Sequence, residues 1–415
     1  MGTERTLVGC RLIDGTGDAP VEDAVVTVRQ GEIVYVGNDH GAAVGEVIDV
    51  AGRTVMPGLI DAHVHLKGFV DRGPGFGPPP MKKGETPRPA DLSWFVLAKA
   101  GRAFLDAGIT TVRDVGSYDA EALVLARAIE LGLTPGPRIR SCGQIISATA
   151  PGGAEFGSMY LEADGPWAVR QAVRRNIRRG AHLIKIMATG ARSVELEDPE
   201  PAQLTRDEIH AAVDEAHRMG YPVAAHAEGL EGTRLAVEAG VDTIEHGLSL
   251  HRAPELLEEM ARRNTVLVPT LSTFFDLAVR FESDFAPKLV EQAKRQTEDA
   301  AKTLRAAMDA GVTIAMGYDS GPPGANATEL IRLVEGGLTP LDAIRAATQG
   351  SATALRLDDV GTLEIGRRAD ILVVDGDPLS DPNVLVGPDH AWLVLKDGRP
   401  VAGTSHDFSG GLAGN

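Results

Sequence analysis

The stretch GLIDAHVHL, residues 58–66, ends an apolar run with two histidines, His63 and His65, that stand one residue apart. Side chains at positions i and i+2 of a β-strand point to the same face, so a strand here aims both imidazoles at one point. Two imidazoles at one point supply half of the ligands that a tetrahedral metal ion needs. The stretch therefore predicts a strand that ends in a metal site.

Apolar strand candidates alternate with amphipathic helical stretches through the middle of the chain. The helical stretches DEIHAAVDEAHRMG and EGTRLAVEAG each close with a glycine, which is typical of a helix C-terminus. This alternation indicates a parallel sheet built from βα units. Eight strand candidates occur, at residues 55–65, 109–115, 138–146, 182–188, 222–228, 242–247, 265–271 and 312–319. Eight units predict an α/β fold of the TIM-barrel type, a (β/α)8 barrel.

The two ends of the chain differ from this middle region, because they consist of short β-branched runs bounded by Gly, Asp or Asn. We expect residues 1–56 and 358–405 to form one smaller, discontinuous β-sandwich domain. Residues 57–357 are then the barrel domain, and residues 406–415 are a flexible tail.

The active site of a (β/α)8 barrel lies at the carboxyl ends of its strands. Five potential ligands fall at those ends, namely His63, His65, His226, His246 and Asp319. A single histidine or aspartate at a strand end is more often a hydrogen-bonded structural residue or a cap. Their coincidence at one end of one barrel favours a metal site, because zinc and similar ions prefer neutral imidazole and carboxylate ligands.

Lys185 stands between Ile184 and Ile186 in the fourth predicted strand. An unpaired ammonium in a buried strand is costly, and burial beside a metal ion would lower the pKa of this lysine and favour the free amine. A free amine reacts with carbon dioxide to give a carbamate, an anionic oxygen ligand able to bridge two metal ions. The alternative is a lysine side chain that reaches out to the barrel mouth.

The composition of the 415-residue chain, 43% hydrophobic and 24% charged, is typical of a globular protein. A net charge of −17 disfavours nucleic acid or an anionic membrane as a partner. The two cysteines, Cys10 and Cys142, do not form a CxxC pair, and no signal-like N-terminus or long apolar run is present. We expect a cytoplasmic protein with a small-molecule substrate, and the sequence leaves a homo-oligomer open.

Several motifs resemble those of the amidohydrolase superfamily, in particular its imidazolonepropionase-like and Xaa-Pro dipeptidase (prolidase)-like hydrolases. The motifs LIDGTG and VMPGLIDAHVHL resemble the family's entry into the barrel, and IKIMATG resembles its carboxylated-lysine strand. AAHAEG and IEHG are similar to its fifth and sixth strands, and GYDSG to its eighth. GTLEIGRRADILVVDGDPL is similar to the segment that returns to the small β domain, so the resemblance covers nearly the whole chain.

The resemblance implies a centre of two divalent metal ions, most simply Zn2+. One ion would bind His63, His65 and Asp319, and the other would bind His226 and His246. Carboxylated Lys185 and a hydroxide would bridge the two ions. Asp319 would take the proton of the attacking water and deliver it to the leaving amine.

The chain departs from the family pattern in two places. After the third strand many relatives carry TGGHG, but this chain reads SATAPGGAEFG and lacks the histidine that would polarise the substrate carbonyl. Glu228 follows His226 where relatives often have His or Tyr, and its carboxylate would repel an acidic substrate unless it were paired. Arg192 is a candidate partner for Glu228 or for a substrate carboxylate, and a solvated loop charge is the alternative.

The leading hypothesis is a binuclear metal-dependent amidohydrolase that cleaves a C–N bond. Its substrate would be an N-acyl amino acid, a dipeptide, or an amide or carbamate xenobiotic. The same site would also suit an ester, a lactone, a phosphoester or a cyclic amide such as imidazolonepropionate. A barrel scaffold that binds partners without catalysis is a third alternative, which the complete ligand set disfavours.

Overall fold

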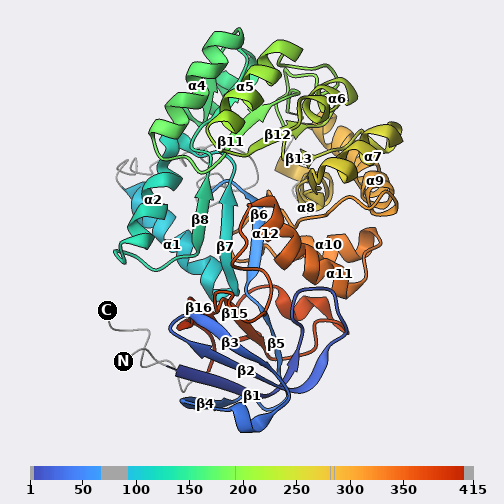
Figure 1. Cartoon of the computed structure of the whole chain (residues 1–415). Coiled ribbons are helices and arrows are strands. Elements are labelled where there is room, and N and C mark those ends of the chain that lie inside the picture. The colour runs from blue at the N-terminus through green and yellow to red at the C-terminus, as the bar shows by residue number, and fades with distance from the viewer. Residues whose placement is uncertain (1–3, 67–91, 192, 281, 285, 406–415) are drawn as a thin grey trace, which may run out of the picture.

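The computed structural model describes residues 4–66, 92–191, 193–280, 282–284 and 286–405. Arg192 and the predicted flexible tail, residues 406–415, lie outside these described residues. Figure 1 shows a sheet made from both ends of the chain, coloured blue and red, next to a larger α/β region that carries most of the helices.

Strands from both ends of the chain pair in one eight-stranded sheet. These strands are β1 (Glu4–Leu12), β2 (Val21–Arg29), β3 (Glu32–Gly37), β4 (Glu46–Asp49), β5 (Thr54–Pro57), β15 (Ile371–Val374), β16 (Ala391–Lys396) and β17 (Arg399–Ala402). Strand β5 joins the two ends, because it pairs in parallel with β1 and antiparallel with β15. The two ends therefore form one β unit, while its arrangement as a sandwich and the domain boundaries stay predictions.

The middle of the chain forms two sheets in which every strand pairing is parallel. The first contains β6 (Leu59–Val64), β7 (Ile109–Asp114) and β8 (Arg138–Ser141). The second, in the order β10-β9-β11-β12-β13-β14, contains β9 (Ile145–Ser147), β10 (Tyr160–Glu162), β11 (Ile184–Met187), β12 (Val223–Ala227), β13 (Thr243–His246) and β14 (Val266–Val268).

Helices follow these strands along the chain, as the βα pattern predicts. They are α1 (Leu92–Asp106), α2 (Glu121–Glu130), α3 (Pro151–Phe156), α4 (Pro166–Arg178), α5 (Arg206–Arg218), α6 (Leu230–Ala239), α7 (Pro254–Arg263), α8 (Leu271–Phe275), α9 (Pro287–Asp309), α10 (Thr328–Gly336), α11 (Pro340–Arg345) and α12 (Ser351–Ala354). Helix α5 shows why they begin where they do. The Thr205 hydroxyl and the Glu208 carboxylate cap each other's backbone N–H groups in a capping box.

Two predicted strands are each divided in the structure. The predicted strand 55–65 changes sheet at Pro57 and Gly58, because Pro57 has no N–H for a ladder and the Gly58 N–H bonds instead to the Asp370 carbonyl. The predicted strand 138–146 likewise divides into β8 and β9, since Gly143 between them has a φ of +74°. The single strands expected at both places are therefore wrong.

The eighth predicted strand, residues 312–319, is not a regular strand, but its backbone bonds to the strands on both sides. The Leu267 N–H donates to the Thr313 carbonyl, and the Ala315 N–H donates to the Leu267 carbonyl. On the other side the Ala62 N–H donates to the Met316 carbonyl. A regular ladder does not form because the Met316 N–H bonds outside these strands, to the Ala346 carbonyl and the Ser351 hydroxyl.

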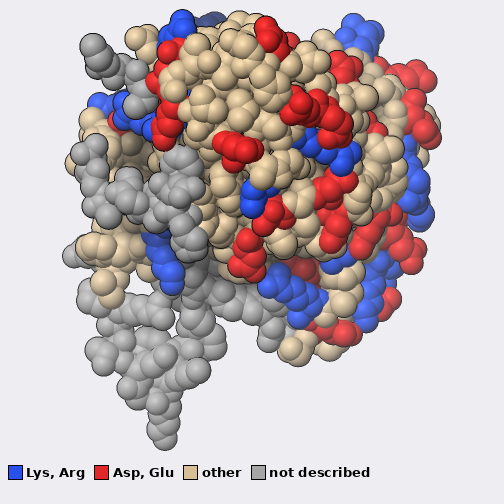
Figure 2. All heavy atoms as spheres, turned by 90° about the horizontal axis from the view of Figure 1, so that it is seen from below, with Lys and Arg blue, Asp and Glu red and all other residues tan. Residues whose placement is uncertain are grey.

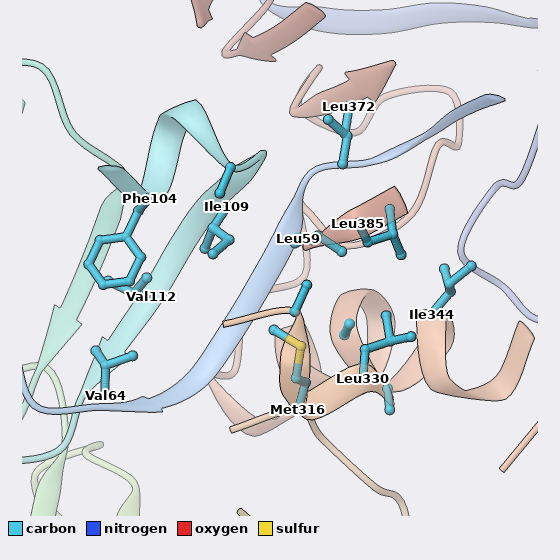
Figure 3. Close-up of a cluster of buried hydrophobic side chains, with 14 of the residues drawn as sticks. Leu59, Val64, Phe104, Ile109, Val112, Met316, Leu330, Ile344, Leu372 and Leu385 are labelled. Atoms are coloured by element: carbon cyan, nitrogen blue, oxygen red, sulfur yellow. The ribbon is translucent and has the colours of Figure 1, made fainter. Parts of the chain in front are cut away.

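The largest apolar cluster lies between the terminal sheet and the α/β region. Figure 3 shows Leu59 of β6 near Leu385 and Leu372 from the C-terminal segment, with Ile109 of β7 on the other side. These side chains are almost fully buried. The cluster therefore holds the start of β6 in place, and β6 leads directly to the paired histidines.

Charged side chains of both signs are interspersed on the face seen in Figure 2. Among the described residues, no helix has both the length and the apolar character that a bilayer crossing requires.

Gly58→Ala is expected to destabilise the fold. A Cβ at residue 58 would lie 2.4 Å from Cγ2 and Oγ1 of Thr110, closer than real atoms approach. Overpacking of this kind costs about 1–3 kcal/mol. Urea unfolding should show the loss, and Thr110→Ala in the same chain should recover part of it because it removes both clashing atoms. A Gly58→Ala variant as stable as the wild type would contradict this packing.

Candidate metal centre

Strand ends bring the predicted site residues to one edge of the parallel sheets. His63 lies in β6, His226 in β12, His246 ends β13, and Lys185 lies in β11. In register, His226 pairs with Met187 and Ala227 with His246. Asp319 reaches the same place because its backbone N–H donates to the His63 carbonyl. All six predicted ligands line one pocket, together with Glu228.

The four imidazoles lie close to one another. The ring centroid of His63 is 5.4 Å from that of His65 and 5.2 Å from that of His246, and the rings of His226 and His246 are 4.6 Å apart. The Nε2 atoms of His63 and His65 each lie 3.7 Å from Oδ1 of Asp319. The predicted convergence of the side chains is therefore present, while their roles as ligands stay a prediction.

Hydrogen bonds fix the orientation of the first two rings. Nδ1 of His63 lies 2.7 Å from Oε2 of Glu245, and Nδ1 of His65 lies 2.8 Å from the Gly116 carbonyl oxygen. Carboxylate and carbonyl oxygens only accept, so both Nδ1 atoms must carry the proton. Nε2, the atom that faces Asp319, is therefore the lone-pair nitrogen in each ring.

The other two rings are oriented in the same manner. Nε2 of His226 lies 3.0 Å from the Gly190 carbonyl oxygen, which makes Nδ1 the lone-pair nitrogen of that ring. Nδ1 of His246 lies 2.7 Å from the Thr270 hydroxyl. Metal-binding histidines commonly engage their second ring nitrogen in this manner.

Burial keeps the rings of the first pair neutral. It lowers the pKa of His65 to about 4, and it lowers the pKa of His63 well below its usual range, with the neighbouring positive charge of Lys185 acting in the same direction. A neutral imidazole has the lone pair that a metal ion needs.

Left-handed backbone turns two of the side chains into the site. His246 has a φ of +70° and Asp319 a φ of +42°, a region that residues with a Cβ rarely adopt. In a regular strand His246 would point away from the face on which Glu245 lies. The left-handed backbone therefore lets His246 line the pocket while Glu245, the residue before it, lies behind His63, and strain of this kind is common at functional sites.

Lys185 is almost fully buried between its neighbours in β11. Burial lowers the pKa of its amine to about 8, while the negative charge of Glu245 opposes this shift. The lysine is therefore inside the pocket, and a side chain that reaches out to solvent, the structural alternative, is wrong.

Glu228 is 2% exposed, and its Oε1 lies 3.5 Å from Nε2 of His226. The pocket wall near it is apolar and consists of Ile145, Phe156, Met159, Tyr160, Met187 and Ala191. The Tyr160 hydroxyl donates to the Met187 sulfur, a weak acceptor.

Sequence reasoning missed several buried polar residues beneath the site. Glu245 bonds to His63, Arg113 bonds to Glu245, and Asp61 accepts the backbone N–H groups of His63 and Tyr318. Burial raises the pKa of Asp61 to about 7. Asp61 could have been found, because it stands at i−2 from His63 and shares its face.

The donor set fits divalent metal ions. Two groups, His63 with His65 and Asp319, and His226 with Glu228 and His246, each hold ligand atoms within 4.8 Å of one another, and all are buried. Imidazole nitrogens with a carboxylate oxygen are the usual ligands of catalytic zinc.

Residues 54–404 match the amidohydrolase family. The chain belongs to this family. Ochratoxinase of Aspergillus niger is 30% identical, over 94% of this chain and 85% of that protein. Imidazolonepropionase of Mycolicibacterium smegmatis is 26% identical, over 92% of this chain and 89% of that protein. A crystal structure of a Xaa-Pro dipeptidase with bound methionine is 30% identical, with a TM-score of 0.85, over 97% of this chain and all of that one.

Membership of the amidohydrolase family makes the chain a metal-binding hydrolase that acts on carbon–nitrogen bonds. The predicted resemblance to this superfamily is thereby confirmed.

Glu329, at the edge of this centre, is expected to make the stability of the protein depend on pH. Its carboxylate accepts the N–H groups of Leu271 and Ser272 at the start of α8, whose Phe274 packs edge-on against His246. Burial raises the pKa of Glu329 from 4.5 to about 8. The folded state therefore holds a proton that the unfolded state loses first, and the resulting stability is present below pH 4.5 and lost as the pH rises through 8.

Glu329→Gln should flatten this dependence. Urea unfolding of metal-free protein should show that the wild type loses stability relative to the variant by up to about 1.4 kcal/mol per pH unit across the window. If the free energies of unfolding of the two proteins changed with pH in parallel, the predicted shift in the pKa of Glu329 would be contradicted.

Proposed function

We propose that the chain is a binuclear metal-dependent amidohydrolase that cleaves an amide-type C–N bond of a small molecule. The observation that carries the proposal is the convergence of four buried, oriented imidazoles, Asp319 and Lys185 in one pocket. The substrate class we favour is an N-acyl amino acid, a dipeptide, or an amide or carbamate xenobiotic. The similarity to ochratoxinase and to a Xaa-Pro dipeptidase supports this choice.

We also infer that the two parallel sheets close into one eight-stranded barrel. The bond from the His182 N–H to the Ser141 carbonyl supports contact between β11 and β8. The bonds of residues 312–319 to β14 and β6 support contact on the other side. Such a closure explains why ligands from distant parts of the sequence share one edge.

His63, His65 and Asp319 would hold one divalent ion, and His226 and His246 would hold the other. Zn2+ is the ion that this nitrogen-rich set suits best. When bound, the ions would activate a water molecule and act as a Lewis acid that polarises the scissile carbonyl.

Lys185 would complete the ligand set as a carbamate. Its neutral amine adds to carbon dioxide, forms an N–C bond and releases one proton, so that a neutral amine becomes an anionic carbamate. The positive charge of Arg113 favours an anion at this position, whereas the negative charges of Glu245 and Asp319 act in the opposite direction.

Asp319 would move protons in the proposed reaction. Asp319 lines the pocket, and its backbone N–H donates to the His63 carbonyl. It would accept the proton of the attacking water and donate it to the leaving nitrogen, so that the amine departs neutral.

The pocket wall favours a substrate with an apolar or aromatic group beside the scissile bond. Phe156, Met159 and Ile145 would pack against it. Glu228 adds negative charge close to the centre and would contact a polar or basic part of the substrate. Arg192 remains the candidate for binding a substrate carboxylate, and it lies outside the described residues.

A cyclic amide is the second candidate substrate, because the chain is similar to imidazolonepropionases over more than nine-tenths of its length. Esters, lactones and phosphoesters are further outcomes of a substrate panel. A homo-oligomeric state and a cytoplasmic location stay predictions.

Chelation tests the proposed function. Removal of metal by a chelator should abolish hydrolysis of N-acyl amino acids and dipeptides, and Zn2+ should restore it. Mg2+ and Ca2+, which prefer oxygen ligands, should not. Full activity in protein that elemental analysis finds free of metal would overturn the proposal.

Glu228→Gln tests the substrate role of Glu228. Two charges about 10 Å apart at an effective dielectric near 20 interact by about 1.7 kcal/mol, so removing the carboxylate should lower KM for an N-acyl amino acid about 16-fold. The matched substrate in which the carboxylate is a carboxamide should change much less. Metal content should be unchanged, and loss of one ion would instead make Glu228 a ligand.

A further inference from the structure

A buried carboxylate lies directly behind the first group of proposed ligands. Glu245 of β13 is completely buried, and its Oε2 is 2.7 Å from Nδ1 of His63. Its other oxygen, Oε1, accepts from Nη2 of Arg113 at 2.7 Å and from the Thr243 hydroxyl at 2.5 Å. Both oxygens are therefore engaged, and each partner donates to the carboxylate.

Arg113 of β7 joins three strands behind the site. Besides Glu245, its Nη1 donates to the Thr243 hydroxyl at 3.0 Å, and its Nε donates to the Ala62 carbonyl at 2.5 Å. Ala62 immediately precedes His63, so the same guanidinium holds the backbone of β6 and the carboxylate that contacts the His63 ring. Arg113 is 2% exposed and is among the largest fully buried side chains.

Two opposite charges without solvent are costly to bury unless they are paired and fully hydrogen-bonded. A core built only for stability would be served as well by apolar side chains of similar volume. The arrangement here does something that apolar residues cannot, because an ionised acceptor at Nδ1 forces the His63 proton onto that nitrogen. Nε2 then presents its lone pair toward Asp319, 3.7 Å away.

We propose that Glu245, clamped by Arg113, is a positioning residue that holds His63 in the one ring orientation and tautomer able to bind a metal ion. The proposal rests on the proposed function, since it assumes that His63 is a ligand. Glu245 also carries a negative charge close to a site that collects four imidazoles and Lys185, and this charge favours a cation among them.

A glutamine at residue 245 cannot replace the glutamate. Its amide has one oxygen and one NH2 group, whereas the native carboxylate accepts bonds at both oxygens. If the oxygen faces Arg113, the NH2 group faces Nδ1 of His63 and favours the opposite tautomer, in which Nε2 carries the proton. If the oxygen faces His63, the guanidinium meets another donor.

The test compares the zinc affinity of purified full-length wild type, Glu245→Gln and a matched control. Glu215→Gln is the control, because Glu215 is also buried and bonded to arginines, namely Arg170, Arg174 and Arg218, but lies on α5 outside the pocket. Zinc stoichiometry is measured by elemental analysis, and affinity by competition with a chromophoric chelator.

The wild type should bind two zinc ions. Glu245→Gln should weaken the binding of one of these ions by about 10- to 100-fold, which is the usual effect of removing the partner of a metal-binding histidine. Glu215→Gln should bind both ions as the wild type does, even if its melting temperature falls. Unchanged zinc affinity in folded Glu245→Gln would overturn the inference alone, whereas a wild type that binds no zinc would overturn the proposed function.

A second measurement covers the case in which Glu245→Gln does not fold. Histidine-selective 15N NMR of the metal-free wild type, with the His63 signal assigned from a His63→Asn variant, reports the tautomer directly. The inference expects the proton on Nδ1 of His63. A proton on Nε2 would overturn it.

Discussion

The site depends on one buried ion pair, Arg113 with Glu245. The guanidinium contacts β6 through the Ala62 carbonyl and β13 through Thr243 and Glu245, while belonging to β7 itself. Because the carboxylate also bonds to His63, a few short, buried hydrogen bonds fix three strands and one proposed ligand to one another. A displacement of any of these strands would break a bond to a buried charge, which is expensive. The ring of His63 therefore cannot move independently of the sheet.

The rest of the pocket follows the same principle, in which each imidazole is held from behind. Carbonyl oxygens of Gly116 and Gly190 and the hydroxyl of Thr270 contact the second nitrogens of the other three rings. Asp61 and Glu329 support the surrounding backbone, and burial raises the pKa of both carboxyls. Many polar groups are thus buried at positions where apolar side chains would be buried at a lower cost in free energy. Such a concentration of oriented donors and acceptors is what a preorganised catalytic site requires.

Local patterns predicted the paired histidines well, because His63 and His65 follow the period of a strand and need no distant information. Glu245 and Arg113 could not be found in this manner. Strand alternation places Glu245 and His246 on opposite faces, and the left-handed backbone of His246 is what lets His246 line the pocket while Glu245 lies behind His63. The division of the strand 55–65 at Gly58 likewise depends on Asp370, some three hundred residues away, whose carbonyl accepts the Gly58 N–H. The periodicity of a sequence predicts which face of a strand each side chain points to, but it does not predict contacts between residues far apart in the chain.

The most direct test of the account is an anomalous-scattering crystal structure of the zinc-loaded protein grown with bicarbonate. The account predicts two zinc peaks in the pocket. One lies among His63, His65 and Asp319, the other lies next to His226 and His246, and added density on the Lys185 amine reaches both. A pocket without zinc, or zinc bound only at surface residues beside an unmodified lysine, would contradict it.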